Sequence, residues 1–240
     1  MLSCVTNTKV GIMTSFISAG IWLAADIVSG AQYSSEVIYF WNTLVRLGFF
    51  LLTVLLIRVG KDLESEKENS HTDYLTGAVN SRFFGEIMQM EINRTIRYQY
   101  PLTIAFIDVD DFKTINDQFG HSVGDKVLET VARAMRQYLR KTDIVARVGG
   151  DEFAILLPEA DIDVAQVAIS KVQQGLLNEM QVNHWPATFS IGVLTFITPP
   201  DSADEMLNMA DKIMYSVKNS GKNNIYYVTY PGKINAENEY

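Results

Sequence analysis

The sequence predicts a mixed α/β (α+β) fold, in which helices flank a β-sheet, preceded by two transmembrane helices. Residues 73–229 alternate between helical and strand patterns around an internal β-hairpin, and such alternation is typical of a sheet covered by helices. Residues 1–59 instead contain two long apolar stretches. At 240 residues, the chain has room for one ordinary domain plus these extra segments.

Charge and cysteine content exclude several classes of protein. The net charge is −8, and residues 1–60 contribute +1 to it because they hold three basic and two acidic residues. The remaining residues therefore carry −9, which argues against a general nucleic-acid-binding surface. Cys4 is the only cysteine, so no internal disulfide can form and a reducing compartment is indicated. The three histidines are widely spaced and do not form a zinc pattern.

Two apolar stretches, Val10–Ala25 and Val37–Val59, predict a membrane hairpin over residues 1–59. A helix that crosses a bilayer needs about 20 such residues. The second stretch reaches this length, and the first does so only if it extends through Ser29. Basic residues precede and follow the hairpin but are absent from the loop between the stretches, so both ends are expected in the cytoplasm. The alternatives are two buried soluble helices or, less favoured, a cleaved signal peptide.

A charged residue, Arg46, lies within the second stretch, where a charge usually faces protein and is partnered. Asp26, near the outer end of the first stretch, is a candidate partner. Alternatively, Arg46 extends its charge to the membrane surface or faces a second copy of the chain. The charge-mixed residues 60–72 then predict a short helical stalk that leaves the membrane.

The elements of residues 73–229 follow from periodicity and capping signals. Asn80 is expected to cap a first helix, whose apolar stripe is Phe84, Ile87, Met88, Ile92 and Ile96. Pro101 ends that segment, and Leu102–Ile107 predicts a buried strand. A second helix follows, with the stripe Val127, Leu128, Val131, Met135 and Leu139. After the hairpin, the pattern predicts a helix from about Asp163 to Leu177 and a strand at Ala187–Phe196. A further helix is expected to begin at a Ser202–Glu205 capping box and to stop at Gly221. The last predicted strand is Ile225–Val228. Residues 230–240 are expected to form a flexible tail.

The segment Gly149-Gly150-Asp151-Glu152-Phe153 lies between two apolar runs, which predicts that its glycines form the turn of the hairpin. Glycine supplies positive φ and a bare backbone that a nucleotide can approach closely. Asp151 and Glu152 would then stand at the exposed tip, where they could hold a divalent cation.

Acidic residues also end the first buried strand. We expect Asp108 and Asp110 to point to alternate faces, so that only one faces the hairpin tip, and we assign Asp108 with Asp151 to a metal ion. Mg²⁺ binds few carboxylates and keeps positions for water and substrate phosphates, which suits such a pair. The alternative is a solvated strand edge that carries no ligand.

Two further pairs suit a nucleotide. Asn116 can serve the ring acceptors of a guanine, and Asp125 can accept from its N1–H and 2-amino group. Alternatively, Asn116 is a turn residue and Asp125 an acid of a first helical turn. Arg140 and Asp143 can bind guanine and phosphate together, or they are only a helix-end arginine and a strand-start acid.

Together, these segments resemble the GGDEF family of diguanylate cyclases over residues 73–229. The resemblance rests on separated motifs in the family's order: Asp73-Tyr-Leu-Thr-Gly77, Asp108-Val-Asp-Asp-Phe-Lys113, Asn116-Asp117, Gly120-His121, Gly124-Asp125, Arg147, Gly149–Phe153 and Phe189-Ser-Ile-Gly-Val193. It implies a fold similar to the palm of class III nucleotidyl cyclases. The implied roles are catalysis for Asp151, Glu152 and Lys113; metal binding for Asp108, the Val109 carbonyl and Asp151; substrate binding for Phe112, Asn116, Asp125, Gly149, Gly150, Lys218 and Lys222; and product inhibition for Arg140 and Asp143. Two positions depart from the family: Lys222 is often an arginine there, and Ser81 replaces a frequent arginine.

The resemblance implies a homodimeric enzyme of the bacterial inner membrane, with its catalytic domain in the cytoplasm. Such an enzyme condenses two GTP into cyclic di-GMP and two pyrophosphates, with Mg²⁺ as cofactor and Mn²⁺ as an alternative ion. The sequence lacks a GxxxxGK[ST] motif, which argues against an ordinary GTPase. The alternatives are a catalytically silent cyclic di-GMP receptor and a membrane signalling adaptor.

Overall fold

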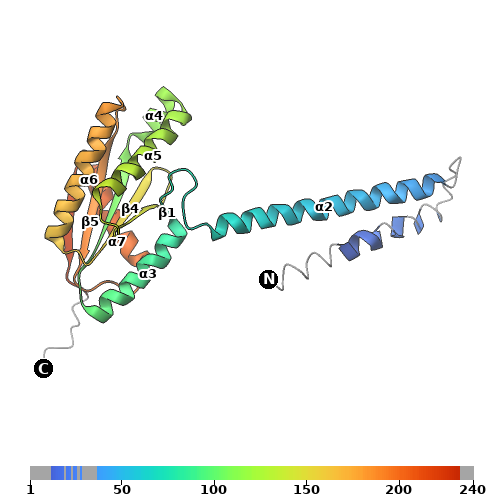
Figure 1. Ribbon diagram of the computed structural model, residues 1–240, viewed down its shortest axis with the longest axis horizontal. Helices are drawn as coiled ribbons and strands as arrows, with labels where there is room; N and C mark the ends of the chain where they lie inside the picture. The colour runs from blue at the N-terminus through green and yellow to red at the C-terminus, as the bar shows by residue number, and fades with distance from the viewer. Residues whose placement is uncertain (1–11, 19, 23, 26–27, 29–36, 233–240) are drawn as a thin grey trace. The chain divides into compact units, whose positions relative to one another are not determined.

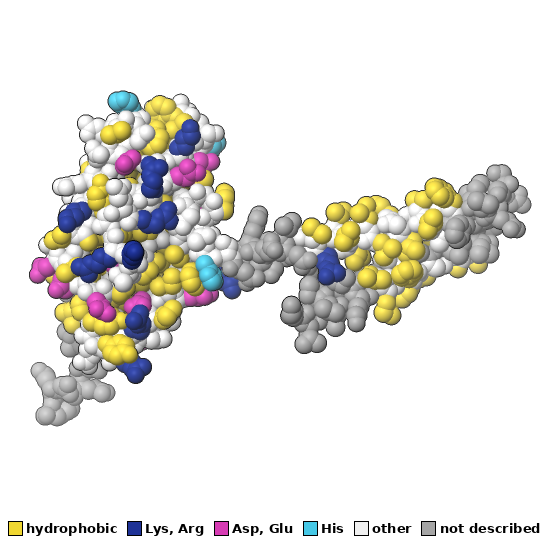
Figure 2. Space-filling model, viewed as in Figure 1, with side chains coloured by type: hydrophobic (Ala, Val, Ile, Leu, Met, Phe, Trp, Pro, Cys, Tyr) yellow, Lys and Arg dark blue, Asp and Glu magenta, His cyan; other side chains and the backbone are white. Residues whose placement is uncertain are grey.

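The computed structural model describes residues 12–18, 20–22, 24–25, 28 and 37–232, and the chain divides into two compact units, 1–70 and 71–240. In the first unit, the helix α2 (Val37–Asn69) contains a stretch, Trp41–Gly60, that is long and apolar enough to cross a membrane and is not buried against protein. Figure 2 shows the hydrophobic side chains that gather along this helix. Ile12–Trp22 forms a shorter apolar helix, so the described residues contain one candidate span and not the two that were predicted.

The charge inside this span has an aromatic neighbour. The guanidinium carbon of Arg46 lies 4.7 Å from the ring centroid of Trp22, which is the geometry of a cation–π contact. Asp26, its predicted partner, lies outside the described residues. The helix α2 continues unbroken to Asn69, so most of the predicted stalk is a direct extension of the span.

The second unit contains a six-stranded sheet in the order β1-β3-β4-β2-β5-β6. The central strand β2 is antiparallel to both β4 and β5, whereas the outer pairs β1–β3 and β5–β6 are parallel. Figure 1 shows α5 and α6 on one face of this sheet and α3 and α7 on the other. The elements are β1 (Val79–Asn80), α3 (Ser81–Tyr98), β2 (Leu102–Asp110), α4 (Phe112–Phe119), α5 (His121–Tyr138), β3 (Ile144–Arg147), β4 (Glu152–Pro158), α6 (Ile162–Val182), β5 (Thr188–Phe196), α7 (Ala203–Asn219) and β6 (Ile225–Tyr230).

The predicted order of elements is confirmed, with two additions. The strand β1 has two residues and the helix α4 has eight, so neither is long enough to show a periodic pattern. The predicted caps are present, because the side chains of Asn80 and Ser202 accept hydrogen bonds from the first turns of α3 and α7. The predicted apolar stripe was wrong at one position. Ile96 is 55% exposed, because the buried side of α3 ends at Thr95.

The pleat of β2 divides the core into two layers. Ala105, Ile107 and Val109 pack with α5 and α6, whereas Ile104 and Phe106 pack with α3 and α7. The acids at the end of β2 continue this second series, which places them on the α7 side of the sheet.

Candidate active site

The glycine pair lies in the turn of an antiparallel hairpin between β3 and β4, as predicted. The N–H groups of Val148 and Gly149 both donate to the carbonyl oxygen of Glu152, at 3.0 and 3.3 Å. Neither Gly149 nor Gly150 has a positive φ, so that part of the prediction was wrong. The turn occupies the four residues between the end of β3 at Arg147 and the start of β4 at Glu152, and it therefore does not need the mirror-image geometry of a two-residue turn.

The two glycines differ in how much space a side chain would have at each position. A Cβ atom at Gly149 would lie 2.2 Å from Oε2 of Glu152, so any side chain there would displace this carboxylate. A Cβ atom at Gly150 would meet nothing within 4 Å. The first glycine therefore makes room for a candidate catalytic acid, and the second leaves the outer side of the turn open.

Strand register brings two acids of the two motifs side by side. Asp108 is the register partner of Glu152, and the N–H of the next residue, Val109, donates to the carbonyl of Asp151 at 3.1 Å. The turn is thus attached to the end of the central strand through the backbone. This pairing joins segments that are more than forty positions apart in the sequence.

The acids at this edge repel one another in a partly dry environment. Asp108 is 3% exposed. Burial raises the pKa of Asp108, the Lys218 ammonium at 2.5 Å lowers it, and the charge of Asp151 raises it again, with a net increase. Burial raises the pKa of Glu152 as well, and the charges of Asp108 and Asp151 add to the rise. A site where carboxylates gather at such a cost favours a bound cation.

The second strand-end acid, Asp110, is held by hydrogen bonds from neighbouring elements. Asp110 accepts hydrogen bonds from the hydroxyls of Thr188 and Ser190, both at 2.7 Å, and from the Asn223 N–H at 3.1 Å. Ser190 is the register partner of Asp108, so Asp108 and Asp110 lie on the same face of the sheet. The prediction of alternate faces was wrong, because residues two apart on a strand share a face. These three donors occupy the Asp110 carboxylate, and it is Asp108 that lies beside Glu152.

The donors at this edge fit a hard divalent ion. Asp108, Asp151 and the Val109 carbonyl offer oxygen atoms, which Mg²⁺ prefers, and a site with few protein ligands leaves room for water and phosphate. Among the residues that the structure describes, no three acidic, histidine or cysteine side chains are arranged as a ready-made metal cage. The ammonium of Lys218 supplies the positive charge beside Asp108 in this arrangement.

The helices α4 and α5 hold the predicted guanine-binding residues. Gly120, with φ +83°, forms the corner between them. A Cβ atom at Gly124 would lie 2.0 Å from Oδ1 of Asn116 and 3.2 Å from Cζ of Phe112, so this glycine allows both side chains to pack against α5 beside the exposed Asp125. Lys113, the remaining candidate on α4, is exposed, and no hydrogen bond or ion pair links it to Asp151 or Glu152 in the described part of the chain.

The end of α7 and the loop that follows it bring the two predicted phosphate-binding cations to the acidic end of β2. Lys218 lies in the last turn of α7 and pairs with Asp108. Lys222 has a φ of +63°, and its Nζ lies 2.7 Å from Oδ1 of Asp111. This exposed ion pair is weak, because water screens it and the long side chain loses freedom in it. Lys222 can therefore exchange Asp111 for a phosphate at little cost.

Arg140 and Asp143 form a tight turn between α5 and β3. The Arg140 N–H donates to the Asp143 carboxylate at 2.8 Å, and the Asp143 N–H donates to the Arg140 carbonyl at 3.1 Å. They line an open hollow of about 550 Å³ between the end of α5 and the start of α6. Burial raises the pKa of Asp143, against the opposing effects of its hydrogen bond and the charge of Arg140.

Sequence reasoning missed the opposite wall of this hollow. Asp163, Val167 and Lys171 line it from α6. They lie four residues apart on one helical face, and this spacing was the available signal.

Comparison with known proteins identifies the family. The family model described as "Diguanylate cyclase, GGDEF domain" matches residues 70–224. The chain belongs to the GGDEF family. This GGDEF protein is 29% identical over 225 residues to the uncharacterized protein YhcK of Bacillus subtilis, and the match covers 90% of the chain and 61% of YhcK. It is 36% identical over 157 residues to the diguanylate cyclase DosC of Escherichia coli, which covers 64% of the chain and 34% of DosC.

Solved structures show the same fold. The diguanylate cyclase SiaD of Pseudomonas aeruginosa, solved in complex with its activator SiaC, is 28% identical and superposes with a TM-score of 0.61. That match covers 95% of this GGDEF protein and 86% of SiaD. The chain spans 61% of the length of YhcK and about a third of DosC.

Proposed function

We propose that this GGDEF protein is a diguanylate cyclase that condenses two GTP into cyclic di-GMP and two pyrophosphates. The observation that carries the proposal is the edge of the sheet where Asp108 and Glu152 are register partners and Lys218 reaches Asp108. The family match and the cyclase relatives support the same reaction.

The proposed chemistry assigns each residue a role. Asn116, Asp125 and Phe112 would hold the guanine, and Lys218 and Lys222 the triphosphate. Asp108, Asp151 and the Val109 carbonyl would hold Mg²⁺ or Mn²⁺, which when bound would polarise the α-phosphate and lower the pKa of the attacking hydroxyl. Lys113 would add a further cation.

The bonds balance over two attacks. The 3′-oxygen of each GTP forms a bond to the α-phosphorus of the other, and the bond from that phosphorus to the β-phosphate bridge breaks, so that two pyrophosphates leave. Glu152 would accept the hydroxyl proton, because it lies beside Asp108 at the edge where the attack would take place.

The same chemistry requires two chains. One site holds one GTP, so two GGDEF domains must face each other, and we propose that α2 anchors the chain in the inner membrane and brings two copies together. The catalytic domain would then lie in the cytoplasm, where GTP is available.

We also propose that the hollow beside Arg140 binds the product. An arginine fork and an acid acceptor suit guanine and phosphate. Lys171 on the opposite wall adds a second cation, and a hollow of about 550 Å³ is within the usual range for nucleotide-sized ligands.

Incubation of the full chain with GTP and Mg²⁺, followed by separation and identification of the nucleotides, tests the proposal. A cyclase releases cyclic di-GMP and pyrophosphate. A silent receptor binds cyclic di-GMP but leaves GTP intact. An adaptor neither binds cyclic di-GMP nor converts GTP. Recovery of unchanged GTP from a folded dimer would refute the proposed reaction.

A further inference from the structure

One guanidinium joins the catalytic turn to the segment at the start of the GGDEF domain. Arg147 is the last residue of β3, directly before the turn. Its Nε and Nη2 donate to the Gly150 carbonyl at 3.1 and 2.7 Å. Its Nη1 lies 3.1 and 3.3 Å from the two carboxylate oxygens of Asp73. Arg147 therefore holds the peptide before Asp151 and an acid more than seventy positions earlier at the same time.

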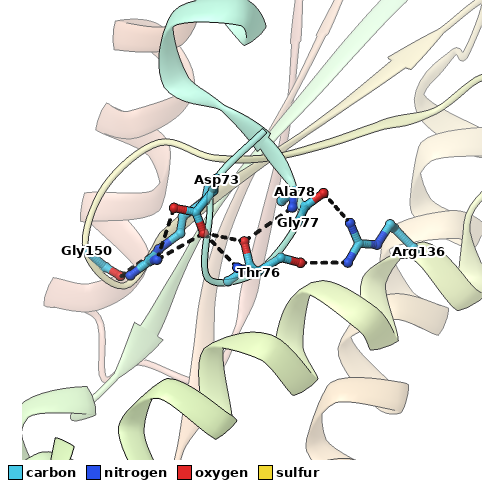
Figure 3. A network of polar contacts seen from close by, with 7 residues as sticks. Asp73, Thr76, Gly77, Ala78, Arg136 and Gly150 are labelled. Atoms are coloured by element: carbon cyan, nitrogen blue, oxygen red, sulfur yellow. Dashed lines mark hydrogen bonds and ion pairs between the residues drawn. The ribbon is translucent and has the colours of Figure 1, made fainter. Parts of the chain in front are cut away.

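The segment that carries Asp73 is itself a well-bonded turn (Figure 3). The Asp73 carboxylate accepts hydrogen bonds from the N–H and the hydroxyl of Thr76, at 2.9 and 2.6 Å. The backbone of Asp73 bonds both Gly77 and Ala78, at 2.9 and 2.7 Å. Displacement of this turn as a unit would therefore carry the Asp73 carboxylate with it.

The link is strong enough to transmit position. The Arg147 and Asp73 side chains are 14% and 15% exposed, so water screens the pair far less than it screens a surface ion pair. The planar fork of arginine fixes the geometry as well as the charge. Burial raises the pKa of Asp73, but the Thr76 hydrogen bonds and Arg147 lower it by more, so the carboxylate is ionised at neutral pH.

We propose that Arg147 is a positioning residue through which the segment 73–78 sets the position of the catalytic turn. The helix α2 ends at Asn69, so the chain enters this segment directly from the proposed membrane stalk. A change in the stalk would move Asp73, and Arg147 would then shift the Gly150 peptide and the acids beside it. For its catalytic consequence, the inference rests on the proposed cyclase activity. A displacement of about 1 Å at a reacting group can cost about a hundredfold in rate.

The structure offers a matched control. Arg136, from α5, donates to the carbonyls of Thr76 and Gly77 at 2.9 and 2.8 Å (Figure 3). It supports the same segment with the same chemical group, but it makes no hydrogen bond to the catalytic turn. Loss of Arg136 therefore tests the stability of the segment without breaking the link.

Amide hydrogen exchange on the full chain in nanodiscs tests the link without reference to catalysis. The amides to follow are those of Val148 and Gly149, which close the turn. We expect Arg147→Lys and Asp73→Asn each to raise their exchange about tenfold, as loss of about 1.4 kcal/mol of local stability would. Arg136→Ala should change it less than about twofold. Asn at position 73 keeps an acceptor for Thr76, and a thermal melt confirms that each variant is folded.

Turnover provides the second readout. We expect Arg147→Lys to lower kcat about 10- to 100-fold with KM for GTP within about twofold, because Arg147 contacts no side chain assigned to GTP and reaches the turn only through the Gly150 carbonyl. Asp73→Asn should lower kcat in the parent but have little further effect in Arg147→Lys, since both changes break one link.

Three outcomes would overturn the inference: unchanged exchange in Asp73→Asn, an equal rise in Arg136→Ala, or a raised exchange with unchanged kcat. If the parent protein forms no cyclic di-GMP, the proposed function fails, whereas the exchange measurement still decides whether Asp73 and Arg147 hold the turn.

Discussion

The catalytic edge and the proposed product hollow use similar groups in different settings. At the catalytic edge, Asp108 is buried at a strand end and pairs with Lys218 through tertiary structure. At the hollow, Arg140 is exposed and Asp143 half-buried, and both lie on a short local turn. Strand register fixes the first group of residues, whereas three consecutive peptide units fix the second.

This difference teaches that the two sites can be changed separately. The catalytic acids are coupled to one another by charge and by the backbone of β2 and β4, so one substitution disturbs several of them. The hollow shares no side chain with that edge among its lining residues. Substitutions should therefore divide cleanly into those that stop synthesis and those that stop product binding.

The largest expected effect is at the tip of the hairpin. Asp151→Asn removes a proposed metal ligand and should lower cyclic di-GMP formation by at least about a thousandfold, because the metal supplies much of the transition-state stabilisation. The residue is half-buried in the turn and packs little, so the fold should remain. Product formation is measured chromatographically, with cyclic di-GMP binding as the control. Full activity in a folded variant contradicts the assignment of this acid.

The next effect is at the hollow. Arg140→Ala removes a charge-assisted contact that contributes about 2–3 kcal/mol, so product binding should weaken roughly 30- to 150-fold. Initial GTP turnover should remain near normal, while the slowdown that accompanies product accumulation disappears. Calorimetry and progress curves with added cyclic di-GMP measure both quantities. Unchanged binding and an equally curved trace would mean that Arg140 and Asp143 only complete a turn.

A smaller effect separates the two glycines. Gly149→Ala forces the Glu152 carboxylate to move and should lower kcat about 10- to 30-fold. Gly150→Ala is the matched control for the fold, because its methyl group meets nothing within 4 Å and should leave the melting temperature unchanged. Steady-state kinetics and thermal melts measure the pair. Equal kcat for Gly149→Ala and the parent would show that Glu152 tolerates displacement.

The smallest expected effect depends on pH. The pKa of Asp73 is lowered in the folded protein, so its ionised form stabilises the fold above the ordinary carboxyl pKa of about 4, and this stabilisation is lost as the pH falls through the lowered value. The melting temperature of Asp73→Asn should therefore lie below that of the parent at neutral pH, and the gap should narrow in acid. If the difference in melting temperature widened in acid, the pKa of Asp73 could not be lowered in the folded protein.

Local signals were predictable from the sequence, and long-range geometry was not. The caps at Asn80 and Ser202 and the hairpin at Gly149 depend on neighbouring residues, and the structure confirms them. The pairing of Lys222 with Asp111 spans 111 positions and depends on how α7 packs. The α6 wall of the hollow likewise exists only once α5 and α6 are in contact.

Elementary strand geometry would have corrected one prediction. The shared face of Asp108 and Asp110 follows from the two-residue period of a strand. The φ angles of the glycine turn, by contrast, depend on the number of unpaired residues between β3 and β4, which the sequence does not specify.

The central claim is that two facing GGDEF domains each contribute one catalytic edge to the reaction. The most direct test is a heterodimer of the parent chain and Asp151→Asn, co-expressed with two affinity tags and purified through both. The account predicts that this heterodimer forms at most the linear dinucleotide from a single attack, with cyclic di-GMP reduced to background. Cyclic di-GMP formation at half the rate of the parent homodimer would contradict the account, because one domain would then complete both bonds alone.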